Sequence, residues 1–175
     1  MKLLLHTCCA PCASHCVLAL QDLGYEVTLF YSNANIAPHD EFLKRLESVH
    51  TLAKRLNVPV LTDEPDHAEW LEQAAKGFER EPEKGARCER CFRYSLSRTC
   101  AAMQKHGFDL FTTSLSVSPH KHTPSIFKVG RELDPKRFLA INFKKDDGFK
   151  HSLQLAAEYG LYRQNYCGCE FSVRD

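Results

Sequence analysis

The stretch His6-Thr7-Cys8-Cys9-Ala10-Pro11-Cys12 follows the apolar run Leu3 to Leu5 and precedes a helical pattern. An apolar run, a turn marked by proline and a helical pattern together predict a strand, a loop and a helix. In an open α/β sheet, ligands bind at the loops that leave the carboxyl ends of the strands. We therefore expect Cys8, Cys9 and Cys12 at a ligand site of a parallel sheet.

Three thiols in such a short loop favour a metal site. Thiolates select zinc, copper(I) or iron–sulfur clusters. A single buried cysteine often serves as a small apolar residue, but the clustering argues against that role in this loop. Cys16 and Cys100 are different, because each lies among apolar residues of a helical pattern. We expect both of them to be buried.

A second pair, Cys88 and Cys91, stands at the start of a later helical pattern. Two thiolates with this spacing can share a metal, and the start of a helix favours their negative charge. The 75 residues between Cys12 and Cys88 exceed the spacing of a zinc ribbon, so the fold must assemble the site. A cluster is favoured over zinc, because the extra thiol and a C-G-C tail indicate electron transfer, which zinc does not support.

The segment from Tyr162 to Asp175 contains that tail, Cys167-Gly168-Cys169, and is too short for another strand and helix. A disulfide across one intervening residue is strained and easily reduced, which suits a redox switch. The glycine permits the tight turn that such a bridge requires. Metal ligation by Cys167 and Cys169 is the alternative to this redox role.

The rest of the chain alternates strand and helix patterns. Strands are expected at 3–5, 26–31, 58–61, 110–113 and 138–142, and helices at 13–23, 38–56, 66–77, 87–106, 125–133 and 148–159. This alternation predicts one α/β domain over residues 1–175, with a doubly wound parallel sheet of about five strands. The loop after the first strand has no glycine, which disfavours ATP hydrolysis or adenylation.

Composition indicates an ordinary cytoplasmic protein. The 175 residues are 43% hydrophobic, and the few apolar residues at the start are too short for a signal peptide. No later segment is long enough to span a membrane, so we expect no membrane partner. Nine cysteines, an odd number, fit a reducing compartment where thiols serve metal or redox chemistry.

The net charge of +1 hides an uneven distribution of basic residues. Residues 87–105 hold five Lys or Arg against one Glu, which indicates a basic face or a solvated surface that happens to be basic. His6, His120 and His122 are expected on strand-exit loops. Each could donate a proton or meet a phosphate, but a loop histidine is more often simply exposed.

Four segments carry a resemblance to a known family. They are L-L-L-H-T-C-C-A-P-C at Leu3–Cys12, N-I-A-P-H-D-E-F-L-K-R at Asn35–Arg45, R-C-E-R-C-F-R-Y at Arg87–Tyr94 and Y-C-G-C at Tyr166–Cys169. Together they resemble the cobalamin-independent epoxyqueuosine reductases, the QueH family, over essentially the whole chain. The resemblance implies an adenine-nucleotide alpha-hydrolase-like, Rossmann-like fold. It also implies an oxidoreductase that removes the epoxide oxygen of epoxyqueuosine at the tRNA wobble position, the last step of queuosine biosynthesis.

The same resemblance implies the cofactor and the site. It places a [4Fe–4S] cluster on Cys8, Cys9, Cys88 and Cys91, and no cobalamin. It makes Cys167 and Cys169 a catalytic, redox-active pair, and it leaves Cys12 as the spare metal ligand nearest to a possible second, mononuclear iron. The partners would be tRNA carrying epoxyqueuosine and an external electron donor.

Arg87, Arg90 and Arg98 fall on neighbouring parts of one helix face and are our candidates for contacts with tRNA phosphates. Two other functions stay open at the level of the sequence. One is a zinc-bearing tRNA-binding module without redox chemistry. The other is a thiol- or persulfide-dependent tRNA-modification protein.

Overall fold

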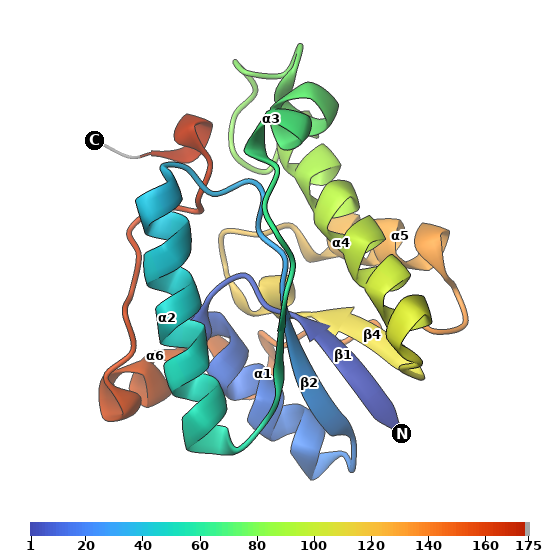
Figure 1. The fold of residues 1–175 in the computed structure, drawn as a ribbon, viewed down its shortest axis with the longest axis vertical. Coiled ribbons are helices and arrows are strands. Elements are labelled where there is room, and N and C mark those ends of the chain that lie inside the picture. The colour runs from blue at the N-terminus through green and yellow to red at the C-terminus, as the bar shows by residue number, and fades with distance from the viewer. Residues whose placement is uncertain (174–175) are drawn as a thin grey trace.

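The computed structural model describes residues 1–173, and at its centre is a four-stranded parallel sheet (Figure 1). The strands are β1 (Lys2–His6), β2 (Glu26–Tyr31), β3 (Val60–Thr62) and β4 (Leu110–Thr113). Their order across the sheet is β3-β2-β1-β4. This is the order of the first four strands of a Rossmann fold, and it leaves β1 paired on both sides.

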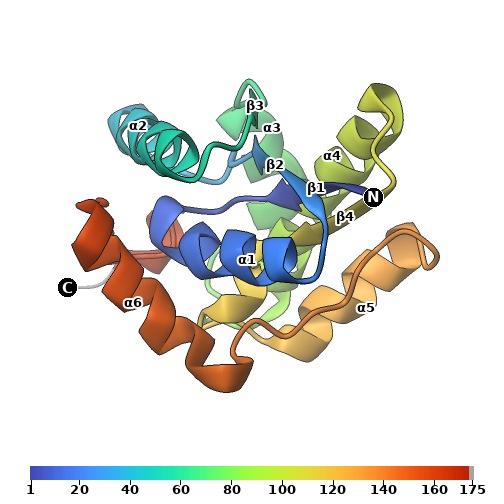
Figure 2. The same cartoon turned by 90° about the horizontal axis from the view of Figure 1, so that it is seen from below.

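Helices cover both faces of the sheet. They are α1 (Ala10–Asp22), α2 (His39–Leu56), α3 (His67–Trp70), α4 (Ala86–His106), α5 (Thr123–Leu133) and α6 (Gly148–Tyr159). Helices α1 and α2 lie on one face and α4 and α5 on the other, while α6 packs alongside α1 (Figures 1 and 2). Across residues 1–173, the structure contains no helix with the length and apolar character needed to cross a membrane.

The apolar run of β1 supplies residues to both sides of the core. Leu3 and Leu5 pack with residues of α1 and α2, whereas Leu4 packs with α4 and with Phe111 of β4. All three leucines are completely buried. Such a run is typical of a central parallel strand that is covered on both faces, and burial of each leucine contributes about 1.5–3 kcal/mol.

The prediction of a fifth strand at 138–142 is wrong. Phe138 forms one isolated parallel bridge with Phe111, and within the described residues the sheet has four strands. Beyond the bridge, the carbonyl oxygens of Leu139 and Ile141 accept hydrogen bonds from the hydroxyls of Thr112 and Ser116. Side-chain hydroxyls therefore make the hydrogen bonds to these two carbonyls that a paired strand would otherwise make.

The helix predicted at 66–77 is shorter and changes type. Asp66 caps α3 by accepting the N–H of Glu69, and a π-helical turn follows over Leu71–Ala75. The backbone N–H of Lys76 donates to Leu71 five residues earlier, as in a π-helix. The strands predicted at 26–31 and 110–113 and the helix predicted at 148–159 are confirmed at their predicted bounds.

Candidate metal and redox centre

The loop between β1 and α1 brings three sulfur atoms together. The sulfurs of Cys8, Cys9 and Cys12 all lie within 4.8 Å of one another. Cys9 is the N-cap of α1, and its sulfur accepts the backbone N–H of Cys12 at 3.4 Å. Pro11, in the first turn, has no N–H that needs a partner, which suits the start of a helix. The predicted cluster of thiols is confirmed, and it could hold a metal ion.

These three thiols are electrostatically coupled. Hydrogen bonds from Cys12 and Cys8 hold the pKa of Cys9 well below its ordinary value, and hydrogen bonds to Cys8 and Cys9 raise the pKa of Cys12. A hydrogen bond with Cys12 lowers the pKa of Cys8. Three other effects outweigh it and raise the pKa of Cys8 to about 11: the hydrogen bond between Cys8 and Cys9, burial, and the charge of Cys9. The three sulfurs thus favour one shared negative charge, and metal binding to all of them would release protons.

His6 joins the strand ends beneath these thiols. Its Nδ1 lies 2.9 Å from the Thr113 hydroxyl of β4, and its Nε2 lies 3.1 Å from the carbonyl oxygen of Ser32, which follows β2. Burial lowers the pKa of His6, so the ring is neutral and serves as a bridge between strands, not as an exposed loop side chain. Beside it, the Ser114 hydroxyl lies 3.2 Å from the backbone nitrogen of Cys8 and 3.3 Å from its sulfur. The end of β4 therefore fixes Cys8.

Helix α4 supplies the second pair of thiols from its first two turns. Cys88 packs against the same apolar cluster as Cys8, and Cys91 lines the same pocket as Cys8, Cys9 and Cys12. Burial raises the pKa of both Cys88 and Cys91. Within residues 1–173, however, the close group of sulfurs consists of Cys8, Cys9 and Cys12 and does not include the α4 pair.

One pocket, with a volume of about 240 Å³, connects these segments. Its thiols are Cys8, Cys9, Cys12, Cys91 and Cys167. Apolar walls come from Phe92, Leu115, Phe149 and Leu153, and polar groups come from Asn35, Lys121 and Gln164. Apolar walls with a few convergent polar groups are typical of a ligand-binding pocket.

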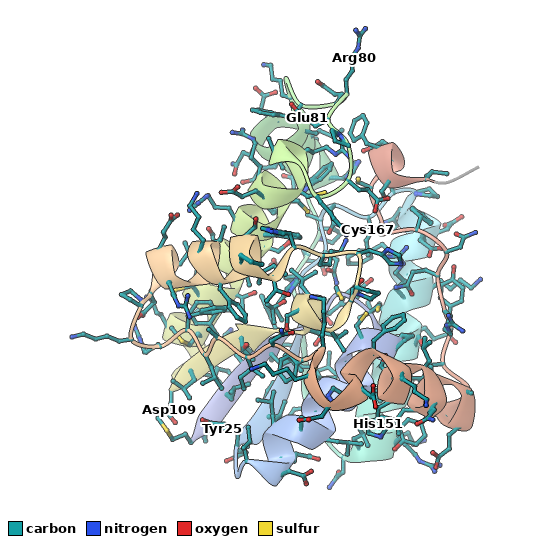
Figure 3. The ribbon with its side chains drawn as sticks, turned by 180° about the vertical axis from the view of Figure 1, so that it is seen from behind. Tyr25, Arg80, Glu81, Asp109, His151 and Cys167 are labelled. Carbon is teal, nitrogen blue, oxygen red and sulfur yellow. The ribbon has the colours of Figure 1, made fainter. Side chains whose placement is uncertain are left out.

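The C-terminal segment folds back along α2 and carries Cys167 to this pocket (Figures 1 and 3). The buried guanidinium of Arg45 donates to the carbonyl oxygens of Cys167 at 2.6 Å and Tyr166 at 3.1 Å. Gly168 has a φ of +151°, and a Cβ there would lie 3.0 Å from Ile36. Glycine is therefore required at the point where the tail turns against the loop after β2.

The two thiols of the tail have different surroundings. Cys167 is half-buried at the pocket, whereas Cys169 is only 6% exposed and packs in an apolar cluster with Trp70 and Tyr94. In Figure 3, Cys167 lies well inside the outline of the molecule, while Arg80 projects from it. All nine cysteines are free thiols in this structure.

Lys121 is a neighbour of Cys167 that the sequence did not reveal. Its ammonium group donates to the sulfur of Cys167. Burial alone would lower the pKa of Lys121, but the charge of Cys167 and this hydrogen bond raise it, so the lysine stays charged beside the thiol. A single lysine in a loop carries no distinctive sequence signal. Of its two histidine neighbours, His120 lines the pocket and His122 is exposed, 2.7 Å from the Ser125 hydroxyl.

Comparisons with known proteins identify the family. A sequence model described as epoxyqueuosine reductase QueH matches residues 3–175 of the chain. The chain belongs to the QueH family. The QueH protein of Haemophilus influenzae is 35% identical over 99% of this chain and 72% of its own length. The QueH protein of Thermotoga maritima is 35% identical over 97% of this chain and 89% of its own length.

A solved structure resembles this QueH chain in fold. It is described as the predicted subunit of a tRNA methyltransferase from Methanocaldococcus jannaschii, with a TM-score of 0.61 and 16% sequence identity. The match covers 90% of this chain and 75% of that one. At this identity the likeness shows the fold alone, and it confirms the Rossmann-like class.

Of the three α4 arginines expected to meet phosphates, this QueH chain buries Arg87, whereas Arg90 and Arg98 keep exposed side chains. Arg87 is 1% exposed and donates to three backbone carbonyls within residues 78–81, so its prediction as a tRNA contact is wrong. A guanidinium buried against backbone carbonyls cannot reach a phosphate at the surface. Arg90 donates to two carbonyls of the π-helical turn, and Arg98 pairs with Asp63. Charge counting along the sequence could not show these partners.

The first prediction concerns the anchor of the tail. We expect iodoacetamide to alkylate Cys169 at least about tenfold faster in Arg45→Met than in the wild type. The variant loses the hydrogen bonds that hold the tail, and a hydrogen bond to a charged group contributes about 1.5–3 kcal/mol. Mass spectrometry of the C-terminal peptide would measure the rate. Arg55→Met is the matched control, since Arg55 lies exposed at the other end of α2. Equal rates in the two variants would show that Arg45 does not hold the tail.

Proposed function

We propose that this chain reduces the epoxide of epoxyqueuosine, at the wobble position of tRNA, to give queuosine. The observation that carries the proposal is the single pocket that unites thiols from three separate segments of the chain: the loop after β1, helix α4 and the C-terminal tail. Membership in the QueH family names the same reaction. Removal of an epoxide oxygen consumes two electrons, and thiols with a metal centre are groups that can deliver them.

In this proposal Cys8, Cys9, Cys88 and Cys91 hold a [4Fe–4S] cluster. The donor set fits, because four thiolates are the usual ligands of such a cluster, and the pKa of Cys9 is already held low by its neighbours. When bound, the cluster supplies electrons one at a time. Cys12, the third member of the close group of sulfurs, is then available to a second, mononuclear iron.

Cys167 and Cys169 are proposed as the redox pair. Their oxidation to a disulfide releases two electrons and two protons. The conversion of an epoxide to an alkene and water consumes the same number of each. An external thiol reductant would reopen the disulfide by exchange, which is favoured by the strain of a bridge across one residue. The ammonium of Lys121, next to Cys167, is placed to stabilise negative charge on the departing oxygen.

The modified base would enter the pocket from a single-stranded loop of tRNA, where unstacked bases are accessible. Phe149 and Tyr166 supply aromatic surface at the pocket for stacking. Arg163 is exposed and lines the pocket, so it replaces the buried Arg87 as our candidate for a contact with a flanking phosphate.

A zinc-bearing tRNA-binding module is the second candidate. It is favoured by the composition of the close sulfur group, since Cys88 and Cys91 lie outside it and three thiolates suit zinc. Colour distinguishes the two candidates. Protein purified without oxygen should be brown and absorb at about 400 nm, as iron–sulfur centres do. A colourless protein with stoichiometric zinc would favour the second candidate.

The second prediction tests the cluster ligands. We expect Cys91→Ser to lose iron and the activity on epoxide-bearing tRNA together, because the cluster loses one of four thiolates. Iron analysis and the brown absorption would measure this. Cys100→Ser is the control on the same helix, because Cys100 packs against the sheet with Leu4 and Phe111 and does not line the pocket. Full iron content in Cys91→Ser would contradict the assignment.

The third prediction separates redox from ligand roles in the tail. We expect Cys169→Ser to keep the iron and its absorption spectrum but to slow multiple turnover sharply, because the disulfide can no longer form. In the wild type without reductant, mass spectrometry should find the peptide with Cys167 and Cys169 two hydrogens lighter. Loss of iron in Cys169→Ser, or normal turnover, would refute the redox pair.

The fourth prediction concerns the RNA contact. We expect Arg163→Ala to weaken tRNA binding and to reduce the slope of log affinity against log salt by about 1, as for the loss of one phosphate contact. Filter binding at several salt concentrations would measure the slope. Arg55→Ala is the control, because Arg55 is exposed in the last turn of α2 and does not line the pocket. Matching slopes in wild type and Arg163→Ala would remove Arg163 from the interface.

A further inference from the structure

Ser114 places a buried hydroxyl against the sulfur of Cys8. Ser114 follows β4 directly and begins a 3₁₀ turn over Ser114–Val117, where it is completely buried. Its hydroxyl oxygen lies 3.2 Å from the backbone nitrogen of Cys8 and 3.3 Å from the sulfur of the same residue. Among residues 1–173, these two contacts are the hydrogen bonds of the Ser114 side chain, so within that part of the chain the hydroxyl serves Cys8 alone.

The available protons give the contact with the sulfur its direction. A backbone N–H can only donate, so the Ser114 oxygen accepts from the backbone of Cys8. The hydroxyl proton then needs an acceptor of its own, because an unmade hydrogen bond of a buried polar group costs stability. The sulfur of Cys8 is the acceptor within reach, and the single proton of this thiol is directed at the sulfur of Cys9, 4.0 Å away. Ser114 therefore donates to the sulfur of Cys8.

Ser116, in the same 3₁₀ turn, shows the same pattern without a sulfur. It is also completely buried, and its oxygen accepts the backbone N–H of Phe143 at 3.2 Å. Its own proton goes to the carbonyl oxygen of Ile141 at 2.8 Å. Each hydroxyl thus accepts one N–H and donates one O–H, and the two serines differ in the acceptor. A neutral thiol is a weak acceptor, whereas a thiolate accepts strongly, so the Ser114 hydroxyl suits a Cys8 that is deprotonated.

We infer that Ser114 is a positioning residue whose hydroxyl donates to Cys8 when that sulfur is a metal-bound thiolate, and that it raises the reduction potential of the centre. Hydrogen bonds to ligand sulfurs are among the factors that set iron–sulfur potentials, because they stabilise the more negative, reduced form. The inference rests on the proposed role of Cys8 as a cluster ligand. It adds to that role a residue from the end of β4, which acts on the metal only through its ligand.

Ser114→Ala tests the inference, because it removes the hydroxyl and little else. We expect the variant, reconstituted with iron and sulfide without oxygen, to bind as much iron as the wild type. A redox titration followed by electron paramagnetic resonance should give it a more negative midpoint potential. Ser116→Ala is the matched control, since it also removes a buried hydroxyl and leaves a backbone N–H without its acceptor, but it breaks no contact with a sulfur. Its midpoint potential should stay at the wild-type value.

An unchanged potential in Ser114→Ala with normal iron content overturns the inference, and so does an equal shift in Ser116→Ala. Failure of the underlying ligand assignment has a different signature, which is normal iron content in Cys8→Ser. A second measurement needs no variant and decides the matter if Ser114→Ala loses its iron. Neutron diffraction from crystals of the iron-loaded wild type in D₂O should place the Ser114 deuteron between its oxygen and the Cys8 sulfur. A deuteron directed elsewhere overturns the inference.

Discussion

The pairing of β1 with β2 on one side and β4 on the other is the constraint on which the site depends. All strands of the sheet run parallel, so the loops that leave their carboxyl ends share one edge. His6 makes this arrangement rigid, because its two ring nitrogens reach the ends of both neighbouring strands. Cys8 and Cys9 follow directly, and Ser114 at the end of β4 holds Cys8 from the other side. The position of the thiols is therefore a consequence of strand order.

A second constraint, a buried positive charge, attaches the C-terminal tail to this edge. The guanidinium of Arg45 is buried, and a buried charge requires compensation and hydrogen-bond partners. Glu41, one turn earlier on α2, supplies the charge, and the carbonyl oxygens of Tyr166 and Cys167 supply acceptors. Arg45 is thus fully satisfied only when the tail is in place. This coupling places Cys167 at the pocket although the tail has little regular structure of its own.

The tail also separates two chemical environments over three residues. Cys167 meets the pocket and the ammonium of Lys121, whereas Cys169 packs among apolar side chains near Trp70. Gly168 makes the separation possible, because its backbone takes a conformation that other residues rarely adopt and its missing side chain leaves room for Ile36. One thiol is thereby accessible to a ligand in the pocket and the other is shielded from it.

The sequence by itself determined the fold class and the location of the thiols. The hydrophobic periods of strands and helices are local properties, and a parallel sheet gathers its exit loops whatever their composition. The burial of Cys16 and Cys100 followed from their apolar neighbours in the same way. The strand expected at 138–142 does not form. The hydroxyls of Thr112 and Ser116 donate to its carbonyl oxygens, and no local sequence pattern reveals these contacts.

Only the tertiary structure decided which groups meet. It closed Cys8, Cys9 and Cys12 into one group and left the α4 pair outside that group in the described residues. It buried Arg87 against carbonyls, where the charge pattern suggested a surface. It joined Lys121 to Cys167 across 46 positions and Arg45 to Cys167 across 122. Contacts over such separations depend on strand order and on the path of the tail, and residue types in sequence encode neither of these locally.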